Sequence, residues 1–174
     1  MQKSLCFRFS LLGVILFIQS CKIGKKIDYC KILQTDQSNL YSPNLTSEEN
    51  ERNLLRRKQI FITNFDILIK EIESNGFPIG RFEIKNDTCT RDAILATFIH
   101  ISQTKPELFY SNKIVNILSK ELTENRLSSD FLYTPVKIGS HNIICDSLKY
   151  KIEKAIKLWK VDNSLIDNFR FKKC

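Results

Sequence analysis

Apolar side chains recur at helical spacing along four long stretches of the chain. In residues 47–74 they return every three, four or seven positions, which predicts a long helix with one apolar face. Thr46 or Ser47 can cap its start, and Gly76 and Pro78 are typical of its end. The expected core stripe is Leu54, Phe61, Phe65, Leu68 and Ile72, widened by Leu55, Ile62 and Ile69.

The other three stretches predict shorter helices. Residues 90–102 are apolar on nearly all sides, so we expect that helix to be central and buried. Residues 105–125 have Pro106 in their first turn, where proline is well tolerated. Residues 145–160 carry an apolar stripe and a lysine-rich opposite face. A short helix over 26–37 precedes all of these.

The segments between the helices have no clear period. Residues 81–85 alternate polar and apolar, as a short strand would, and residues 168–174 do the same at the C-terminus. We interpret residues 127–142 as a long irregular connection, because Pro135 and Gly139 interrupt it. The expected fold is mainly α, a small bundle of four to five helices with short irregular or extended segments.

The first 21 residues have the pattern of an export signal. Lys3 and Arg8 come before a short apolar run over 11–18, which is too short to span a bilayer. The ending Ile-Gln-Ser-Cys resembles the lipobox of bacterial lipoproteins. That resemblance implies acylation of Cys21, palmitate being a typical chain, and a periplasm-facing protein held at the cell envelope by membrane lipid. An ordinary secreted protein, an uncleaved anchor and a cytosolic protein are the alternatives.

The predicted export signal and the acylation of Cys21 divide the chain into three parts. Residues 1–20 form the signal peptide, residues 21–46 the lipid anchor and tether, and residues 47–174 a single helical domain. Lysines at 22, 25 and 26 are either attracted to anionic headgroups or simply solvated. Two or more acyl chains would hold the protein stably at a membrane.

Four cysteines remain once Cys6 leaves with the signal and Cys21 takes the lipid: Cys30, Cys89, Cys145 and Cys174. An even number of cysteines in an oxidising compartment indicates disulfides, and four allow three pairings. We favour 30–174 together with 89–145. The alternative is buried free thiols.

Composition narrows the classes of partner. The formal net charge of +8 falls to +6 on removal of the signal peptide, which holds two basic residues and no acidic one. The remaining basic residues are spread along amphipathic segments, so we expect no nucleic-acid binding. No cysteine or histidine spacing indicates a metal site, and no cofactor motif is present.

Only two histidines are available for catalysis. His100 lies in the central helix and would need a carboxylate or thiol partner, but Asp92 is two turns away on the same helix. His141 lies near Cys145, although a surface role suits it better. We interpret His100 first as a core or cleft histidine.

Three short motifs resemble those of a family of uncharacterised bacterial proteins. They are Asp36-Gln37, Gly76-Phe77-Pro78 and Phe98-Ile99-His100, and the similarity spans about residues 30–127. The family has no established activity, so no catalytic role carries over. The resemblance makes Asp36, Gln37, Pro78 and His100 the residues to test first.

Together these observations favour a membrane-anchored lipoprotein with a binding or structural role in the envelope over an enzyme. One competing hypothesis is a hydrolase-like enzyme that uses His100 with a carboxylate such as Asp36. Another is an inhibitor or immunity-like protein that binds a toxic or degradative partner.

Overall fold

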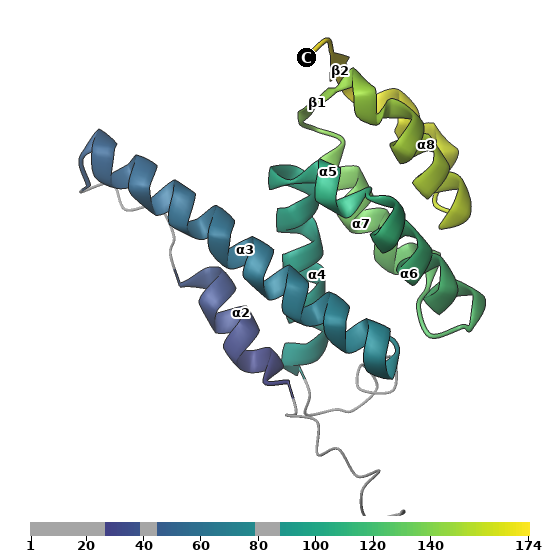
Figure 1. The fold of residues 1–174 in the computed structure, drawn as a ribbon, viewed down its shortest axis with the longest axis horizontal. Helices are drawn as coiled ribbons and strands as arrows, with labels where there is room; N and C mark the ends of the chain where they lie inside the picture. Colours follow the sequence, from purple (N-terminus) through teal and green to yellow (C-terminus); the bar gives the residue numbers. More distant parts are fainter. Residues whose placement is uncertain (1–26, 39–44, 79–87) are drawn as a thin grey trace, which may run out of the picture.

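The structure, a computed structural model, describes residues 27–38, 45–78 and 88–174 of the chain. The prediction of a mainly α fold is confirmed, with seven α-helices in the described residues instead of four to five (Figure 1). The α-helices are α2 (Tyr29–Gln37), α3 (Ser47–Asn75), α4 (Thr88–Thr104), α5 (Pro106–Phe109), α6 (Asn112–Thr123), α7 (Ser129–Gly139) and α8 (Lys149–Leu158).

The long helix α3 begins and ends close to where the sequence predicts. Thr46 caps it through a capping box, in which its hydroxyl accepts from the Glu49 N–H and the Glu49 carboxylate accepts from the Thr46 N–H. The helix ends at Gly76, whose φ of 78° favours glycine and whose N–H donates to the Ile72 carbonyl.

Helix α4 is the centre of the fold, as its sequence predicts. It packs against α2, α3, α5 and α7. Fully buried apolar side chains lie along its length, because neighbouring helices cover it from several sides. These side chains are Ala93, Ile94, Phe98 and Ile101.

The helix expected over 105–125 is divided in two. The short helix α5 begins with Pro106 and ends at Phe109, and α6 starts after Ser111. The Ser111 hydroxyl caps α6 by accepting from the Ile114 N–H. The break buries Phe109 and Tyr110 against Trp159 of the C-terminal region.

The prediction of an irregular connection over 127–142 is wrong, because this segment contains α7. Its buried residues are Leu132, Pro135, Val136 and Gly139, a helical spacing. Gly139 allows α7 to approach α4 closely, since a Cβ there would lie 3.0 Å from the Ser102 hydroxyl oxygen. That hydroxyl in turn donates to the Pro135 carbonyl.

The C-terminal region combines α8 with two 3₁₀ turns, η2 (Asp146–Leu148) and η3 (Asn163–Asn168). Strands β1 (Ile143–Cys145) and β2 (Arg170–Lys172) form a parallel two-stranded sheet in which Ile144 lies opposite Phe171. The extended C-terminus expected from the sequence is therefore present as β2. Its partner β1 includes Cys145, which was expected to start the helix over 145–160.

Helix α2 belongs to the packed part of the molecule, although it lies in the range 21–46 that the sequence assigns to the anchor and tether. Tyr29 and Ile32 are buried against α3 and α4. Cys21, which the sequence predicts to be acylated, and the strand expected over 81–85 lie outside the described residues.

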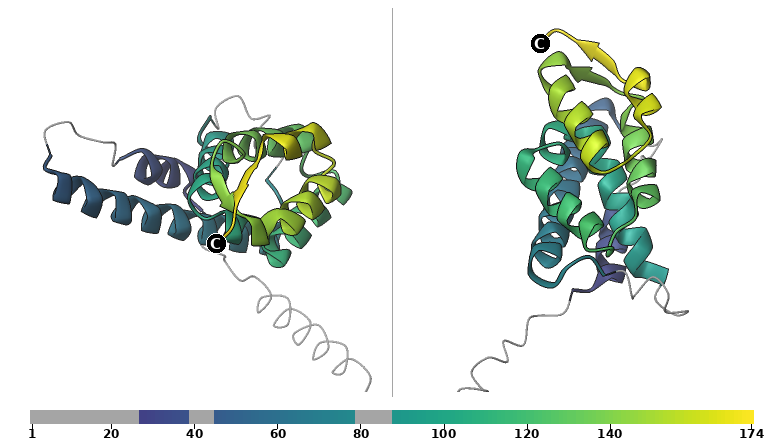
Figure 2. Two further views of the ribbon diagram at one scale, coloured as in Figure 1. Left: turned by 90° about the horizontal axis from the view of Figure 1, so that it is seen from above. Right: turned by 90° about the vertical axis from the view of Figure 1, so that its right-hand side faces the viewer.

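The first half of α3 extends beyond the rest of the bundle (Figures 1 and 2). None of residues 47–60 is buried, whereas Phe61 is the first of a regular series of buried residues. We call residues 47–60 the α3 arm. Leu54 was expected in the core stripe, but it is 48% exposed, and Leu55 is 59% exposed.

Candidate functional site

The structure brings together Asp36 and His100, the two residues that sequence reasoning proposed for catalysis. Asp36 lies in the last turn of α2 and His100 in the last turns of α4, and Asp36 Oδ2 is 2.9 Å from His100 Nδ1. His100 Nδ1 makes no hydrogen bond within the described residues, so we describe this approach as a close polar contact. The Asp36 side chain has no exposed area, whereas 24% of the His100 side chain is exposed.

Helix packing fixes the position of Asp36 in this pair. Asn64 of α3 donates from its amide to the Ile32 carbonyl and the Thr35 hydroxyl, both at 3.4 Å, which joins α2 to α3. Gln37 donates from its amide to Asp36 Oδ2 at 3.1 Å. Within the described residues Asp36 Oδ1 accepts no hydrogen bond, so this buried carboxylate is only partly satisfied.

The imidazole of His100 also stacks on an aromatic ring. Phe61 of α3 lies parallel to it, with 4.1 Å between ring centroids and 25° between planes. The guanidinium of Arg57 lies 5.8 Å from the centroid of the same Phe61 ring, a cation–π distance. Sequence reasoning missed Phe61 as a neighbour of His100, because its spacing marks it only as a residue of the apolar face of a helix.

A carboxylate paired with a histidine can orient the ring and stabilise its protonated form. His100 Nδ1 is buried against Asp36, so the exposed area of the side chain belongs to its other atoms. Nucleophilic catalysis would also need an activated hydroxyl or thiol beside the ring. Cys30, Cys89 and Cys145 are held in disulfides, which also removes the thiol that the His141–Cys145 pair would require.

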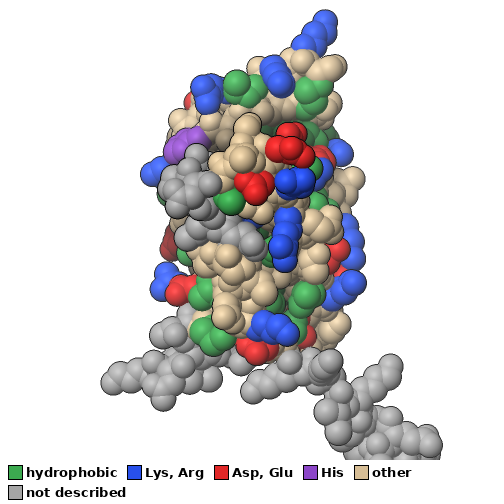
Figure 3. Space-filling model, turned by 90° about the vertical axis from the view of Figure 1, so that its left-hand side faces the viewer, with side chains coloured by type: hydrophobic (Ala, Val, Ile, Leu, Met, Phe, Trp, Pro, Cys, Tyr) green, Lys and Arg blue, Asp and Glu red, His purple; other side chains and the backbone are tan. Residues whose placement is uncertain are grey.

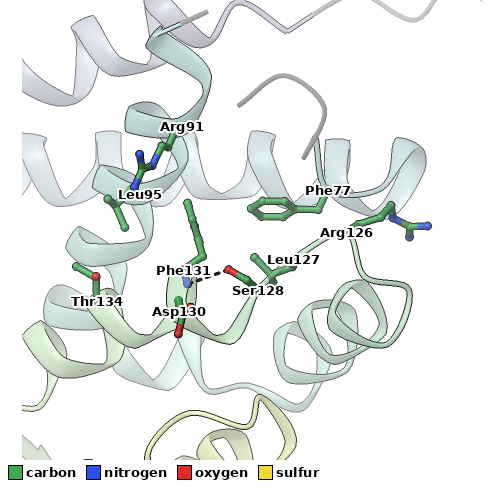
Figure 4. Close-up of a pocket in the computed structure, with 9 residues that line it drawn as sticks. All are labelled: Phe77, Arg91, Leu95, Arg126, Leu127, Ser128, Asp130, Phe131 and Thr134. Carbon is green, nitrogen blue, oxygen red and sulfur yellow. Dashed lines mark hydrogen bonds between the residues drawn. The ribbon is translucent and has the colours of Figure 1, made fainter. Parts of the chain in front are cut away.

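A cavity of about 280 Å³ lies away from this pair (Figure 4). Phe77 and Phe131 meet edge to face at its wall, with ring centroids 5.4 Å apart, and Ser128 caps α7 beside them by accepting from the Phe131 N–H. Arg126 points away from the other lining residues (Figure 4). Neither Asp36 nor His100 lines this cavity.

The four cysteines form two disulfides, but the favoured pairing is wrong. Cys30 of α2 is bonded to Cys89 of α4, and Cys145 of β1 is bonded to Cys174. The first bond joins two helices that pack against each other, and the second holds the C-terminus beside the sheet. The alternative of buried free thiols is also excluded for these four residues.

The remaining residues singled out from the sequence have structural surroundings. Pro78 follows the end of α3, where it prevents the helix from continuing. In the described part of the chain, no three His, Cys, Asp or Glu side chains are grouped so that they could bind a metal ion. Nor does any described helix have the length and hydropathy needed to cross a membrane.

Charged side chains on the surface are of both signs. On the face shown in Figure 3, basic and acidic groups are interspersed, with no extended area of one sign. The α3 arm has the same mixture, and Arg52 and Glu48 form an ion pair one turn apart. Leu54 and Leu55 of the arm are exposed, although the apolar pattern of the sequence predicts them on the core side of the helix.

Comparison of the chain with protein-family models, with curated proteins and with solved structures finds no match. The resemblance to a family carrying Asp36-Gln37 and His100 motifs therefore stays a prediction. The described residues define a mainly α protein with two disulfides, a contact between His100 and the buried carboxylate of Asp36, and a protruding helical arm.

A double-mutant cycle on Asp36 and His100 tests whether the two side chains act on each other. We expect Asp36→Ala and His100→Ala to show a coupling of about 1 kcal/mol in urea unfolding, because the carboxylate is buried and in contact with the ring. Lys105 and Glu107, an exposed pair 3.5 Å apart, serve as the control and should give less than about 0.5 kcal/mol. Equal coupling in the two cycles would contradict a special role for the buried pair.

Proposed function

We propose that the protein is a lipid-anchored envelope protein whose helical domain binds another protein through the α3 arm. Acylated Cys21 attaches it to the membrane, and the domain faces the periplasm. In this proposal the Asp36–His100 pair holds α2 on α4 and has no catalytic role.

Two features support the location. The sequence begins with an export pattern that ends at Cys21. The four cysteines that follow are all in disulfides, bonds that persist in oxidising compartments and are rare in the cytosol.

The observation that carries the binding role is the exposure of Leu54 and Leu55 on the α3 arm. A helix in a small domain gains most of its stability by burying an apolar face, yet this half of α3 buries none of its residues. The capping box at Thr46 and the Glu48–Arg52 pair keep the arm helical without such burial. The arm therefore presents a preformed helix, which lowers the entropic cost of binding a partner.

The hydrolase-like alternative has one observation in its favour, the 2.9 Å contact between Asp36 and His100. It would require a substrate site beside the exposed part of His100 and a water or hydroxyl that the ring can activate. The cavity of Figure 4 does not supply that site, because it is lined by other residues. An inhibitor or immunity-like role is a form of protein binding and shares the test below.

The anchor is tested by the intact mass of the protein isolated from the membrane fraction. We expect a chain that starts at Cys21 and carries acyl chains. A chain that starts at Met1, or one that is cleaved without lipid, would refute the anchor.

The binding role is tested by placing a photo-crosslinking amino acid at position 55 and irradiating cells that carry the full chain. We expect a defined cross-linked protein product from position 55. The same amino acid at position 150, where Tyr150 is 75% exposed on α8, serves as the control and should give none. No product from position 55, or equal products from both positions, would overturn the proposal.

A further inference from the structure

Four residues of the α3 arm form an exposed surface with an unusual symmetry. Glu51, Leu54, Leu55 and Lys58 are separated by three, one and three positions, so they lie on one face of the helix. Glu51 and both leucines are exposed, and Lys58 is half-buried. We call these four residues the arm face.

The arm face is complementary to itself when two copies of the helix run antiparallel. A two-fold axis between positions 54 and 55 places Leu54 of one copy against Leu55 of the other. The same axis places Glu51 of each copy opposite Lys58 of the other, which gives two equivalent Glu51–Lys58 pairs. The result is an isologous interface with an apolar centre and two symmetric ion pairs.

Other arrangements of the same face are less favourable. A parallel, in-register pair would oppose Glu51 to Glu51 and Lys58 to Lys58, which are repulsive contacts. An antiparallel pair centred on Leu54 would instead oppose Arg52 to Arg56, two positive charges. Each of these arginines follows an arm-face residue by one position and is rotated from it by about 100° around the helix, so both lie outside the arm face. The charge pattern therefore favours the antiparallel pair centred between Leu54 and Leu55 over these two alternatives.

We propose that the α3 arm binds the α3 arm of a second copy of this chain, antiparallel, through Glu51, Leu54, Leu55 and Lys58. This inference rests on the proposed function and names the partner of its binding site. Two helical turns bury less area than a standard protein interface, so the dimer is expected to be weak in dilute solution. Anchoring both copies on one membrane raises their effective concentration and allows the contact to form.

The test uses charge exchange in the purified full chain, reconstituted in lipid vesicles so that it is the only protein present. With the photo-crosslinking amino acid at position 55, we expect a cross-linked dimer whose linkage maps to the region of Leu54. Glu51→Lys or Lys58→Glu alone should lower the dimer yield about fivefold or more, because each turns two attractive pairs into repulsive ones. The double variant Glu51→Lys/Lys58→Glu should restore the yield to within about twofold.

Matched controls reverse charges on the bundle half of the same helix. Asp66→Lys and Lys70→Glu change exposed residues of α3 outside the arm and should leave the dimer yield unchanged. Circular dichroism before irradiation shows that each variant is folded. No dimer in the vesicles, or a yield that neither single reversal lowers, would overturn this inference.

The two proposals fail in different ways. A product from position 55 in cells that contains a different protein, with no dimer in vesicles, would overturn the second copy as partner and leave the binding role of the arm intact. An absence of any product in both preparations would overturn both.

Discussion

Replacement of both Cys30 and Cys89 by serine is expected to lower the free energy of unfolding by about 4 kcal/mol. The bond joins residues 59 positions apart, and a crosslink that closes a loop of that length restricts the unfolded chain strongly. Helix α2 is only nine residues long, with Tyr29 and Ile32 as its buried apolar side chains, so its packing depends on this bond. Urea unfolding of the full chain measures the loss.

The second disulfide provides the matched control. Cys145 and Cys174 are 29 positions apart, about half the separation, so the loop-closure argument predicts a loss about 0.6 kcal/mol smaller for that double serine variant. Alkylation before and after reduction should give four additional modified cysteines only after reduction in the unsubstituted domain, and two in each variant. A smaller loss for the Cys30–Cys89 variant than for the control would contradict the loop-length argument.

The sequence determines the helices well because their signals are local. The capping residue Thr46, the stop at Gly76 and the stripe from Phe61 to Ile72 all depend on neighbours along the chain. The same stripe could not show that Leu54 lies outside the bundle. Periodicity identifies the apolar face of a helix, whereas the length of that face that is covered depends on which other helices reach it.

Helix α7 shows how breaker residues can mislead. Pro135 and Gly139 are typical of loops, but both lie on the buried side of α7 together with Leu132 and Val136. The small Gly139 permits close contact with Ser102 of α4. The helical spacing of the segment becomes visible only when Pro135 and Gly139 are counted with Leu132 and Val136 as buried positions.

Long-range pairing could not be derived from local patterns. Asp36 meets His100, and Cys30 meets Cys89, because α2 packs along α4, and nothing in the spacing of either helix specifies that neighbour. The sequence supplied Asp36 and His100 as candidates but left their contact to the fold. Loop length alone also leaves all three pairings of four cysteines possible.

Substitution of Glu121, a buried carboxylate that accepts three hydrogen bonds, is expected to destabilise the protein strongly. The carboxylate accepts from the Phe77 N–H at 2.7 Å and from Arg126 Nε and an Arg126 terminal nitrogen at 2.6 and 2.7 Å. Only 3% of the side chain is exposed. Glu121→Ala leaves the buried Phe77 N–H without this acceptor, so we expect a loss of about 2–3 kcal/mol in urea unfolding. Glu124→Ala is the control, because Glu124 pairs with the same arginine but is 38% exposed, and it should cost less than about 1 kcal/mol.

The same carboxylate should make the stability of the protein depend on pH. Burial disfavours the charged form of Glu121 and by itself would raise its pKa. The hydrogen bonds from Arg126 and the Phe77 N–H, together with the positive charges of Arg126 and Lys120, have the opposite effect and outweigh burial. The pKa of Glu121 is therefore lowered below its ordinary value of 4.5. A lowered pKa in the folded state means that the stabilisation is complete above pH 4.5 and is lost as the pH falls through the lowered value. Glu121→Gln keeps an oxygen for the Phe77 N–H and removes the titrating group. Unfolding measured from pH 7 to pH 3 should therefore show a shallower acid loss in Glu121→Gln than in the unsubstituted protein, and equal slopes would contradict this assignment.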